Sequence, residues 1–215
     1  MTTPPRPAEL DGEGEAGGLF LTLPPVVQLD VDQFYELCRL NRELRIERAA
    51  GGGLSIMPPV GGETSRRNAE IARQLGNWAR RTGTGASFDS SCGFVLSNGA
   101  IRSPDASWVL HARLRDLTDR QRSRFLPLCP DFVVELRSPT DSLQVLQDKM
   151  REYMDNGAGL GWLIDPQRRE VLVYRSDGSV ECLRAPEHVS GQRLMAGFRL
   201  ELQEIWVVDT LAANQ

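Results

Sequence analysis

Residues 129–165 have the sequence CPDFVVELRSPTDSLQVLQDKMREYMDNGAGLGWLID, which predicts a strand, a helix and a second strand in succession. Side chains alternate along the first strand, so Glu135 and Arg137 share a face with Val133, opposite Phe132 and Val134. Burying an unpaired carboxylate in such an apolar strand costs several kcal/mol. Glu135 therefore needs a cationic partner, which makes it a candidate functional residue.

The helix of this segment is predicted to begin with Ser138 as the N-cap and Pro139 as the first helical residue, and to end near Asn156-Gly157. Its apolar stripe consists of Leu143, Leu146, Met150, Tyr153 and Met154. Helical geometry puts Lys149 about 40° beyond the Tyr153 edge of this stripe. Its ammonium can therefore reach the strand on which the helix packs. Gln147 lies on the opposite border of the stripe.

The flanking segments complete an α/β pattern. We expect one helix from Asp30 and another from Thr64, and Asn98-Gly99 predicts a hairpin. The expected strands are Leu44–Ile46, Leu54–Met57, Phe88–Leu96, Ile101–Leu110, Leu160–Ile164 and Val171–Arg175. The predicted fold is a single domain over residues 24–215, with a mixed β-sheet flanked by helices. Residues 1–23 are expected to form a disordered, acidic arm rich in Pro and Gly.

The composition excludes several classes of protein. The 215 residues are 40% hydrophobic with a formal net charge of −4, which is typical of a soluble globular chain. No apolar run approaches the roughly 20 residues that a membrane span needs, and no secretory signal is evident, so we expect a cytoplasmic protein. Four separated cysteines and two histidines argue against a zinc site, a disulfide framework and histidine-based catalysis.

Lys149 is the only lysine, because every other basic residue is an arginine. Its compact ammonium is not interchangeable with a guanidinium, although a single lysine could also persist by chance. Asp105, directly after Pro104, and Glu135 offer hard oxygen ligands that select Mg²⁺ or Mn²⁺. Such an ion beside a lysine suits phosphodiester hydrolysis. The structural alternative is an Asp at a strand turn, a Glu paired with Arg137 or with an arginine of the basic helix, and a lysine that extends toward solvent.

Two segments carry a family resemblance: RSPDASWV at residues 102–109, and CPDFVVELRSPTDSLQVLQDKMREYMDNGAGLGWLIDPQRREVLVYR at residues 129–175. They closely resemble the Uma-two restriction endonuclease family, a branch of the PD-(D/E)XK nuclease superfamily. The resemblance extends over roughly residues 28–206. It implies a restriction-endonuclease-like core.

The resemblance also implies roles for particular residues. Asp105 and Glu135 match the metal-binding acids, and Glu70 matches an acid on the first core helix that often assists them. Arg137 occupies the position where the superfamily usually has lysine, and Lys149 matches the helical position to which this family moves it. Both remain candidates for the basic group.

The expected function is Mg²⁺-dependent endonucleolytic cleavage of DNA, with Mn²⁺ able to substitute, by a homodimer. We expect catalytic roles for Asp105, Glu135 and Lys149, and substrate contacts from Arg66, Arg67, Asn68, Arg137 and Gln147. Residues 37–81 contain nine arginines against four acids, which favours a polyanionic partner. Two alternatives remain open. The first is an inactive nuclease-fold module that binds nucleic acid or a protein, and the second is a metal-dependent phosphoesterase for a small substrate.

Overall fold

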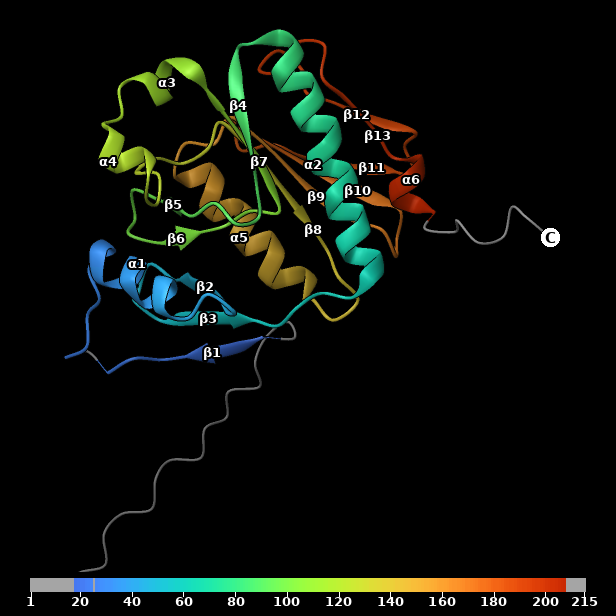
Figure 1. Ribbon diagram of the computed structural model, residues 1–215. Helices are drawn as coiled ribbons and strands as arrows, with labels where there is room; N and C mark the ends of the chain where they lie inside the picture. The colour runs from blue at the N-terminus through green and yellow to red at the C-terminus, as the bar shows by residue number, and fades with distance from the viewer. Residues whose placement is uncertain (1–17, 25, 208–215) are drawn as a thin grey trace, which may run out of the picture.

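A computed structural model describes residues 18–24 and 26–207. Its centre is a six-stranded sheet in the order β11-β10-β9-β8-β7-β4 (Figure 1). The strands are β4 (Gly85–Asp89), β7 (Ala106–Leu110), β8 (Phe132–Leu136), β9 (Leu160–Asp165), β10 (Glu170–Arg175) and β11 (Val180–Arg184). β8 and β9 run parallel and the other neighbours antiparallel. The sheet is therefore mixed, as the sequence predicts.

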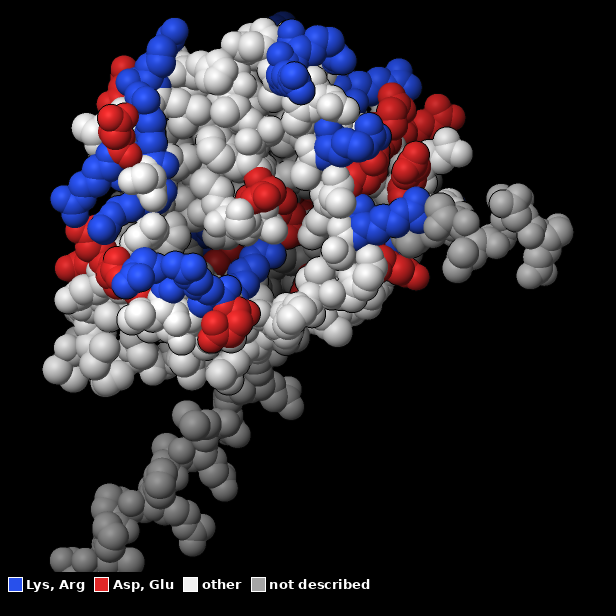
Figure 2. All heavy atoms as spheres, in the orientation of Figure 1, with Lys and Arg blue, Asp and Glu red and all other residues white. Residues whose placement is uncertain are grey.

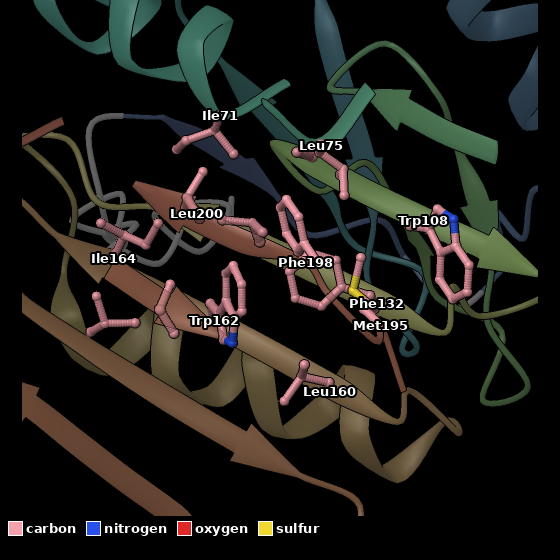
Figure 3. Packing of buried hydrophobic residues seen from close by; sticks show 14 of the residues in the cluster. Ile71, Leu75, Trp108, Phe132, Leu160, Trp162, Ile164, Met195, Phe198 and Leu200 are labelled. Atoms are coloured by element: carbon pink, nitrogen blue, oxygen red, sulfur yellow. The ribbon is translucent and has the colours of Figure 1, made fainter. Parts of the chain in front are cut away.

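The two long helices cover opposite faces of this sheet. α2 (Gly62–Thr82) belongs to one buried cluster and α5 (Leu143–Asp155) to the other. Trp108 and Phe132 face α2, whereas Val133 faces α5, which confirms the predicted alternation in β8. Figure 3 shows the packing of the first cluster, including Ile71, Leu75, Phe132, Trp162 and Phe198.

A second, five-stranded sheet lies beside this core, in the order β1-β3-β2-β6-β5. Its strands are β1 (Leu19–Leu21), β2 (Arg45–Arg48), β3 (Leu54–Met57), β5 (Phe94–Val95) and β6 (Ile101–Arg102). It packs with α1 (Val31–Leu40) through Phe34, Leu54 and Ile101. Because β3 leads directly into α2 and β6 leads into β7, this sheet is held against the end of the central sheet at which Asp105 lies.

The remaining elements close the edges of the domain. They are α3 (His111–Arg115), α4 (Asp119–Arg122), β12 (His188–Ser190), β13 (Arg199–Glu201) and α6 (Gln203–Trp206). β12 and β13 pair with each other, and their Val189 and Leu200 extend the cluster under α2. Among the described residues, no helix is long and apolar enough to cross a membrane.

The strands predicted as Phe88–Leu96 and Ile101–Leu110 are each interrupted, so this prediction is wrong in detail. β4 ends at Asp89, whose side chain accepts a hydrogen bond from the backbone N–H of Ser91 at 3.0 Å and turns the chain. Pro104 interrupts the second strand because it has no N–H to donate. The halves far from the Asn98-Gly99 turn pair as β4 with β7 in the six-stranded sheet. The halves next to the turn pair as β5 with β6 in the five-stranded sheet. The hairpin at Asn98-Gly99 is confirmed, with Gly99 at a φ of 87°.

The helix predicted to start at Ser138 starts four residues later. The N-cap is Ser142, whose hydroxyl accepts a hydrogen bond from Val145 N. Asp141 instead closes a turn over residues 138–141, because its Oδ2 accepts a hydrogen bond from Ser138 N at 2.8 Å. The turn lengthens the loop between β8 and α5, which lines the candidate site.

The predicted arm over residues 1–23 falls mostly on residues 1–17, which lie outside the described residues. Its end is folded, which corrects the boundary at residue 24. Leu19–Leu21 form β1, which pairs antiparallel with β3 from Leu19 opposite Ile56 to Leu21 opposite Leu54. β1 has only three residues, which is too few for a recognisable alternation of apolar and polar side chains. The sequence before it is rich in Pro and Gly, which favours a disordered segment.

Candidate active site

Asp105 and Glu135 come together on adjacent strands. Ala106 of β7 pairs with Val134 of β8 in antiparallel register, so Asp105, one residue earlier, lies opposite Glu135. Asp105 Oδ2 also accepts a hydrogen bond from Leu136 N at 2.9 Å, which fixes the carboxylate against β8. Asp105 is 9% and Glu135 3% exposed. Two carboxylates therefore lie next to each other below the protein surface.

Lys149 reaches these acids from α5, as its helical position predicts. Its Nζ lies 2.9 Å from Glu135 Oε1 and 3.0 Å from Glu47 Oε1. Tyr153, one turn further along the helix, donates a hydrogen bond from Oη to the same Glu135 oxygen at 2.9 Å. The only lysine of the chain thus bridges two buried carboxylates.

Glu47 is one of the site residues that the sequence reasoning missed. It lies on β2 and is 3% exposed, although the alternating strand Arg45–Arg48 resembles a solvated surface strand. Its Oε1 accepts a hydrogen bond from Ser103 N at 2.9 Å, and its Oε2 lies 3.3 Å from Arg102 Nη1. The only sequence signal was indirect: β2 is followed by a tight turn and another strand, so it could be an inner strand with a buried face. Glu47 connects the five-stranded sheet to the lysine.

Asp105 has its own polar partners. Arg45 Nη1 and Asn68 Nδ2 each lie 3.4 Å from Asp105 Oδ1. Arg45 is held by the carbonyl oxygen of Ser103, which accepts from its Nη2 at 2.5 Å. The amide oxygen of Asn68 is buried without a partner. These contacts are long, so Asp105 Oδ1 keeps capacity for a further cationic ligand.

The shared burial shifts the pKa values of the bridged groups. Burial raises the pKa of Glu135 to about 7, against the lowering effect of Lys149 and with further raising by Asp105 and Glu47. Glu47 is also penalised by burial, but Lys149, Arg102 and Arg45 together lower its pKa below the ordinary value. Of these two acids, Glu135 has the less compensated negative charge, and a further cation would stabilise its ionised form.

These residues lie in a cavity of about 850 Å³. In Figure 2 the face toward the viewer is hollowed near its centre, where acidic and basic atoms are both visible. Its lining includes seven carboxylates against four cations, an excess of three negative charges when all are ionised. The acids are Glu47, Glu63, Asp105, Glu135, Asp141, Asp148 and Glu152, and the cations are Arg45, Arg67, Arg102 and Lys149. A polyanion meets net repulsion here unless a metal ion offsets it.

The other residues expected at the site divide into two groups. Asn68 and Arg67 line the cavity, although Arg67 also donates from Nε to the carbonyl oxygen of Ile205 at 2.8 Å. Glu70, Arg66, Arg137 and Gln147 are not among the lining residues. The Glu70 carboxylate binds Arg73 at 2.5 Å and Gln74 at 2.8 Å, and Glu70 does not line the cavity that contains Asp105. The structure therefore does not bring Glu70 to the two acids, and Arg66 lies 4.0 Å from Glu204 on the outer side of α2.

Arg137 contacts neither Glu135 nor the cavity. Its Nη1 lies 2.7 Å from Asp165 Oδ2, and Asp165 is 3% exposed. Its Nε donates to the carbonyl oxygen of Asp141 at 3.1 Å. Arg137 thus joins the end of β9 to the turn before α5, and of the two basic candidates Lys149 is the one that touches the acids.

Replacing Arg137 with methionine should lower the free energy of unfolding by about 3 kcal/mol, because Asp165 loses its close cation while buried. Urea denaturation followed by tryptophan fluorescence measures this loss. Arg168→Met is the matched control, since Arg168 lies 3.9 Å from the same carboxylate but its side chain is 57% exposed, and it should change stability by less than about 1 kcal/mol. A fully stable Arg137→Met protein would contradict this structural role.

The donor set fits a hard divalent cation. Residues 18–24 and 26–207 contain no group of three or more His, Cys, Asp and Glu side chains arranged to hold a metal ion. Mg²⁺ is, however, commonly bound through one or two carboxylates and retains several waters. Asp105 and Glu135 supply two adjacent carboxylates in a cavity with excess negative charge. Mg²⁺ or Mn²⁺ therefore suits this site better than zinc, which takes nitrogen and sulfur ligands.

Comparison with known proteins shows similarity to a sequence family and to solved structures. Residues 31–210 match the Uma2 family, whose description is "Putative restriction endonuclease". A solved structure from Anabaena variabilis, described as "a putative nuclease belonging to DUF820", matches with a TM-score of 0.66 at 19% sequence identity, over 83% of this chain and 97% of that one. At this identity the structural similarity is one of fold. No curated protein matches the chain.

Proposed function

The chain belongs to the Uma2 family, and from that membership and the site geometry we propose that it is a Mg²⁺-dependent endonuclease that hydrolyses phosphodiester bonds of DNA. One observation carries the proposal: Lys149 Nζ lies 2.9 Å from Glu135, beside Asp105, at the base of a cavity. Two adjacent carboxylates that can hold a metal ion, and an ammonium that can stabilise negative charge, suit metal-assisted phosphodiester hydrolysis.

We assign a role to each residue of the site according to its charge. Asp105 and Glu135 would hold the metal ion, which supplies an activated water and neutralises charge on the phosphate. Lys149 would donate hydrogen bonds from Nζ to the attacking water or to a phosphate oxygen, and its contact with Glu135 supports this role. In the hydrolysis, the attacking water would lose one proton to solvent as its oxygen forms a bond to phosphorus, the P–O bond to one sugar would break, and the leaving oxygen would take up a proton from another water molecule. Glu47 and Tyr153 would position Lys149 and Glu135 for these steps.

The excess of acids in the cavity supports a metal requirement before chemistry begins. A phosphodiester entering an ionised lining with three surplus negative charges is repelled, and a divalent ion removes most of that surplus. The same charge balance disfavours a module that binds DNA through this cavity without metal. Cutting both strands of a duplex would in addition suit a two-fold homodimer, which light scattering after gel filtration would reveal.

The proposal is tested by incubating a single-stranded DNA circle and a supercoiled plasmid with the protein in EDTA, Mg²⁺ or Mn²⁺. We expect cleavage with Mg²⁺ or Mn²⁺ and none in EDTA. Asp105→Asn should lower the rate by about 10³-fold, because losing one metal ligand costs several kcal/mol of transition-state stabilisation. Asp177→Asn, at an exposed turn between β10 and β11, is the matched control and should cleave at the parent rate. Equal cleavage with EDTA and with Mg²⁺ would contradict the proposal.

A further inference from the structure

Asn68 has a buried polar atom that is left unsatisfied beside the two acids. Its Oδ1 is buried and has no hydrogen-bond partner in the part of the chain that the structure describes. Its Nδ2 lies 3.4 Å from Asp105 Oδ1, which is long for a hydrogen bond from an amide. Buried acceptors without a partner are rare in native proteins, and a bound ion is one of the usual reasons for them.

The position of Asn68 brings a third element of the fold to the acids. Asp105 precedes β7 and Glu135 lies on β8, whereas Asn68 lies on α2 and lines the same cavity. Asp105 uses Oδ2 to accept the hydrogen bond from Leu136 N at 2.9 Å. Asn68 therefore faces Oδ1, the oxygen of Asp105 that is not bonded to the backbone of β8.

The two orientations of the Asn68 carboxamide differ in their electrostatics. In the present one, the amide NH₂ faces Asp105 and the oxygen is unsatisfied. A half-turn about the Cβ–Cγ bond brings Oδ1 to the place of Nδ2, where two acceptor oxygens repel each other. A divalent cation between them reverses this repulsion, since neighbouring oxygens around Mg²⁺ are only about 3 Å apart. Such an ion gives the carboxamide oxygen the partner that it lacks.

Resting on the metal dependence proposed above, we infer that Asn68 is a third ligand of the metal ion, through Oδ1, alongside Asp105 and Glu135. A carboxamide oxygen is a hard donor of the kind that suits Mg²⁺ and Mn²⁺. It is neutral, so it adds a ligand without adding to the negative charge of the cavity. This assigns Asn68 to the ion instead of to the DNA contacts expected from the sequence.

Isothermal titration calorimetry with Mn²⁺ in the absence of DNA tests the assignment. Asn68→Leu keeps the approximate shape of the side chain but removes its oxygen, and it should weaken Mn²⁺ binding about tenfold or more. Asn77→Leu is the matched control, because Asn77 is exposed on the same helix, and it should bind Mn²⁺ like the parent protein. Circular dichroism checks that both variants are folded.

A spectroscopic measurement separates direct ligation from support of Asp105. In Asn68→Cys a thiolate replaces the carboxamide oxygen, and its bond to Co²⁺ should give a thiolate-to-cobalt charge-transfer band in the near ultraviolet. Asn77→Cys introduces the same thiol away from the acids. Its spectrum with Co²⁺ should match that of the parent protein, which contains four cysteines.

Mn²⁺ binding by Asn68→Leu at the parent affinity would overturn the inference. Weaker binding without a cobalt band in Asn68→Cys would also overturn it, because Asn68 would then act only through its hydrogen bond to Asp105. A parent protein that binds no Mn²⁺ would overturn both the inference and the metal dependence of the proposed function. Mn²⁺ binding without cleavage of any DNA would overturn the nuclease function alone, and the Asn68 variants would still decide the ligand.

Discussion

Lys149→Arg is expected to lower the rate of DNA cleavage by roughly 10²–10³-fold while the protein stays folded, because a preorganised donor to the transition state is misplaced. Lys149 Nζ fits between two carboxylate oxygens at 2.9 and 3.0 Å. A guanidinium is planar and larger, so it keeps the charge but cannot put one compact donor at that point. The rate on a single-stranded circle in Mn²⁺ measures the effect, and thermal unfolding monitored by circular dichroism checks the fold.

The control uses the neighbouring basic residue of the same helix. Arg151 is exposed and pairs with Asp148, so Arg151→Lys should leave the rate unchanged. Cleavage by Lys149→Arg at the parent rate would show that charge alone suffices there. That result would contradict the inference that the site requires the compact ammonium of a lysine at position 149.

The second large effect is on stability. Lys149→Met should lower the free energy of unfolding by about 3–5 kcal/mol, because it leaves Glu47 and Glu135 buried without their shared cation. Glu47 is 3% exposed and lies in contact with the same Nζ as Glu135. Adding Glu47→Gln to Lys149→Met should recover part of the loss, since one of the two buried charges is then absent. Urea denaturation of the single and double variants at pH 8 measures both quantities.

The same variant should show a defined pH dependence. Burial raises the pKa of Glu135 to about 7 even with Lys149 present, and loss of Lys149 removes a lowering influence and raises it further. A carboxyl whose folded pKa lies above its unfolded value destabilises the fold as pH rises past the unfolded value of 4.5. Lys149→Met should therefore lose more stability at pH 8 than at pH 5. Arg151→Met, which affects an exposed pair, should change little at either pH, and an equal loss in both variants would contradict the bridge.

The central triad of side chains could be predicted because it depends on local periodicity. The period of two in β8 puts Glu135 on the face away from Phe132, and helical geometry aims Lys149 at the same strand. Asp105 joined them because β7 and β8 are sheet neighbours. The placements of Glu135 and Lys149 required no knowledge of a distant part of the chain, whereas that of Asp105 depends on the pairing of β7 with β8.

The other parts of the site depend on packing between distant segments, which periodicity does not report. Glu47 lies on a sheet that the sequence did not separate from the central one, and its role depends on β2 being adjacent to β6. Glu70 lies two positions after Asn68 on the same helix, and residues with this spacing point about 200° apart around the helix axis. Only Asn68 therefore reaches Asp105. The start of α5 moved because the Asp141 side chain closes a turn and competes with the capping box expected at Ser138.

The most direct test of the account is isothermal titration calorimetry of the folded parent protein, Asp105→Asn and Glu70→Gln with Mn²⁺ in the absence of DNA. We predict that the parent and Glu70→Gln bind Mn²⁺ alike, whereas Asp105→Asn loses the binding, because Asp105 holds the ion in the proposed site and Glu70 contacts Arg73 instead. Undiminished Mn²⁺ binding by Asp105→Asn, or its loss in Glu70→Gln, would contradict the assignment of Asp105 and Glu135 as the metal site.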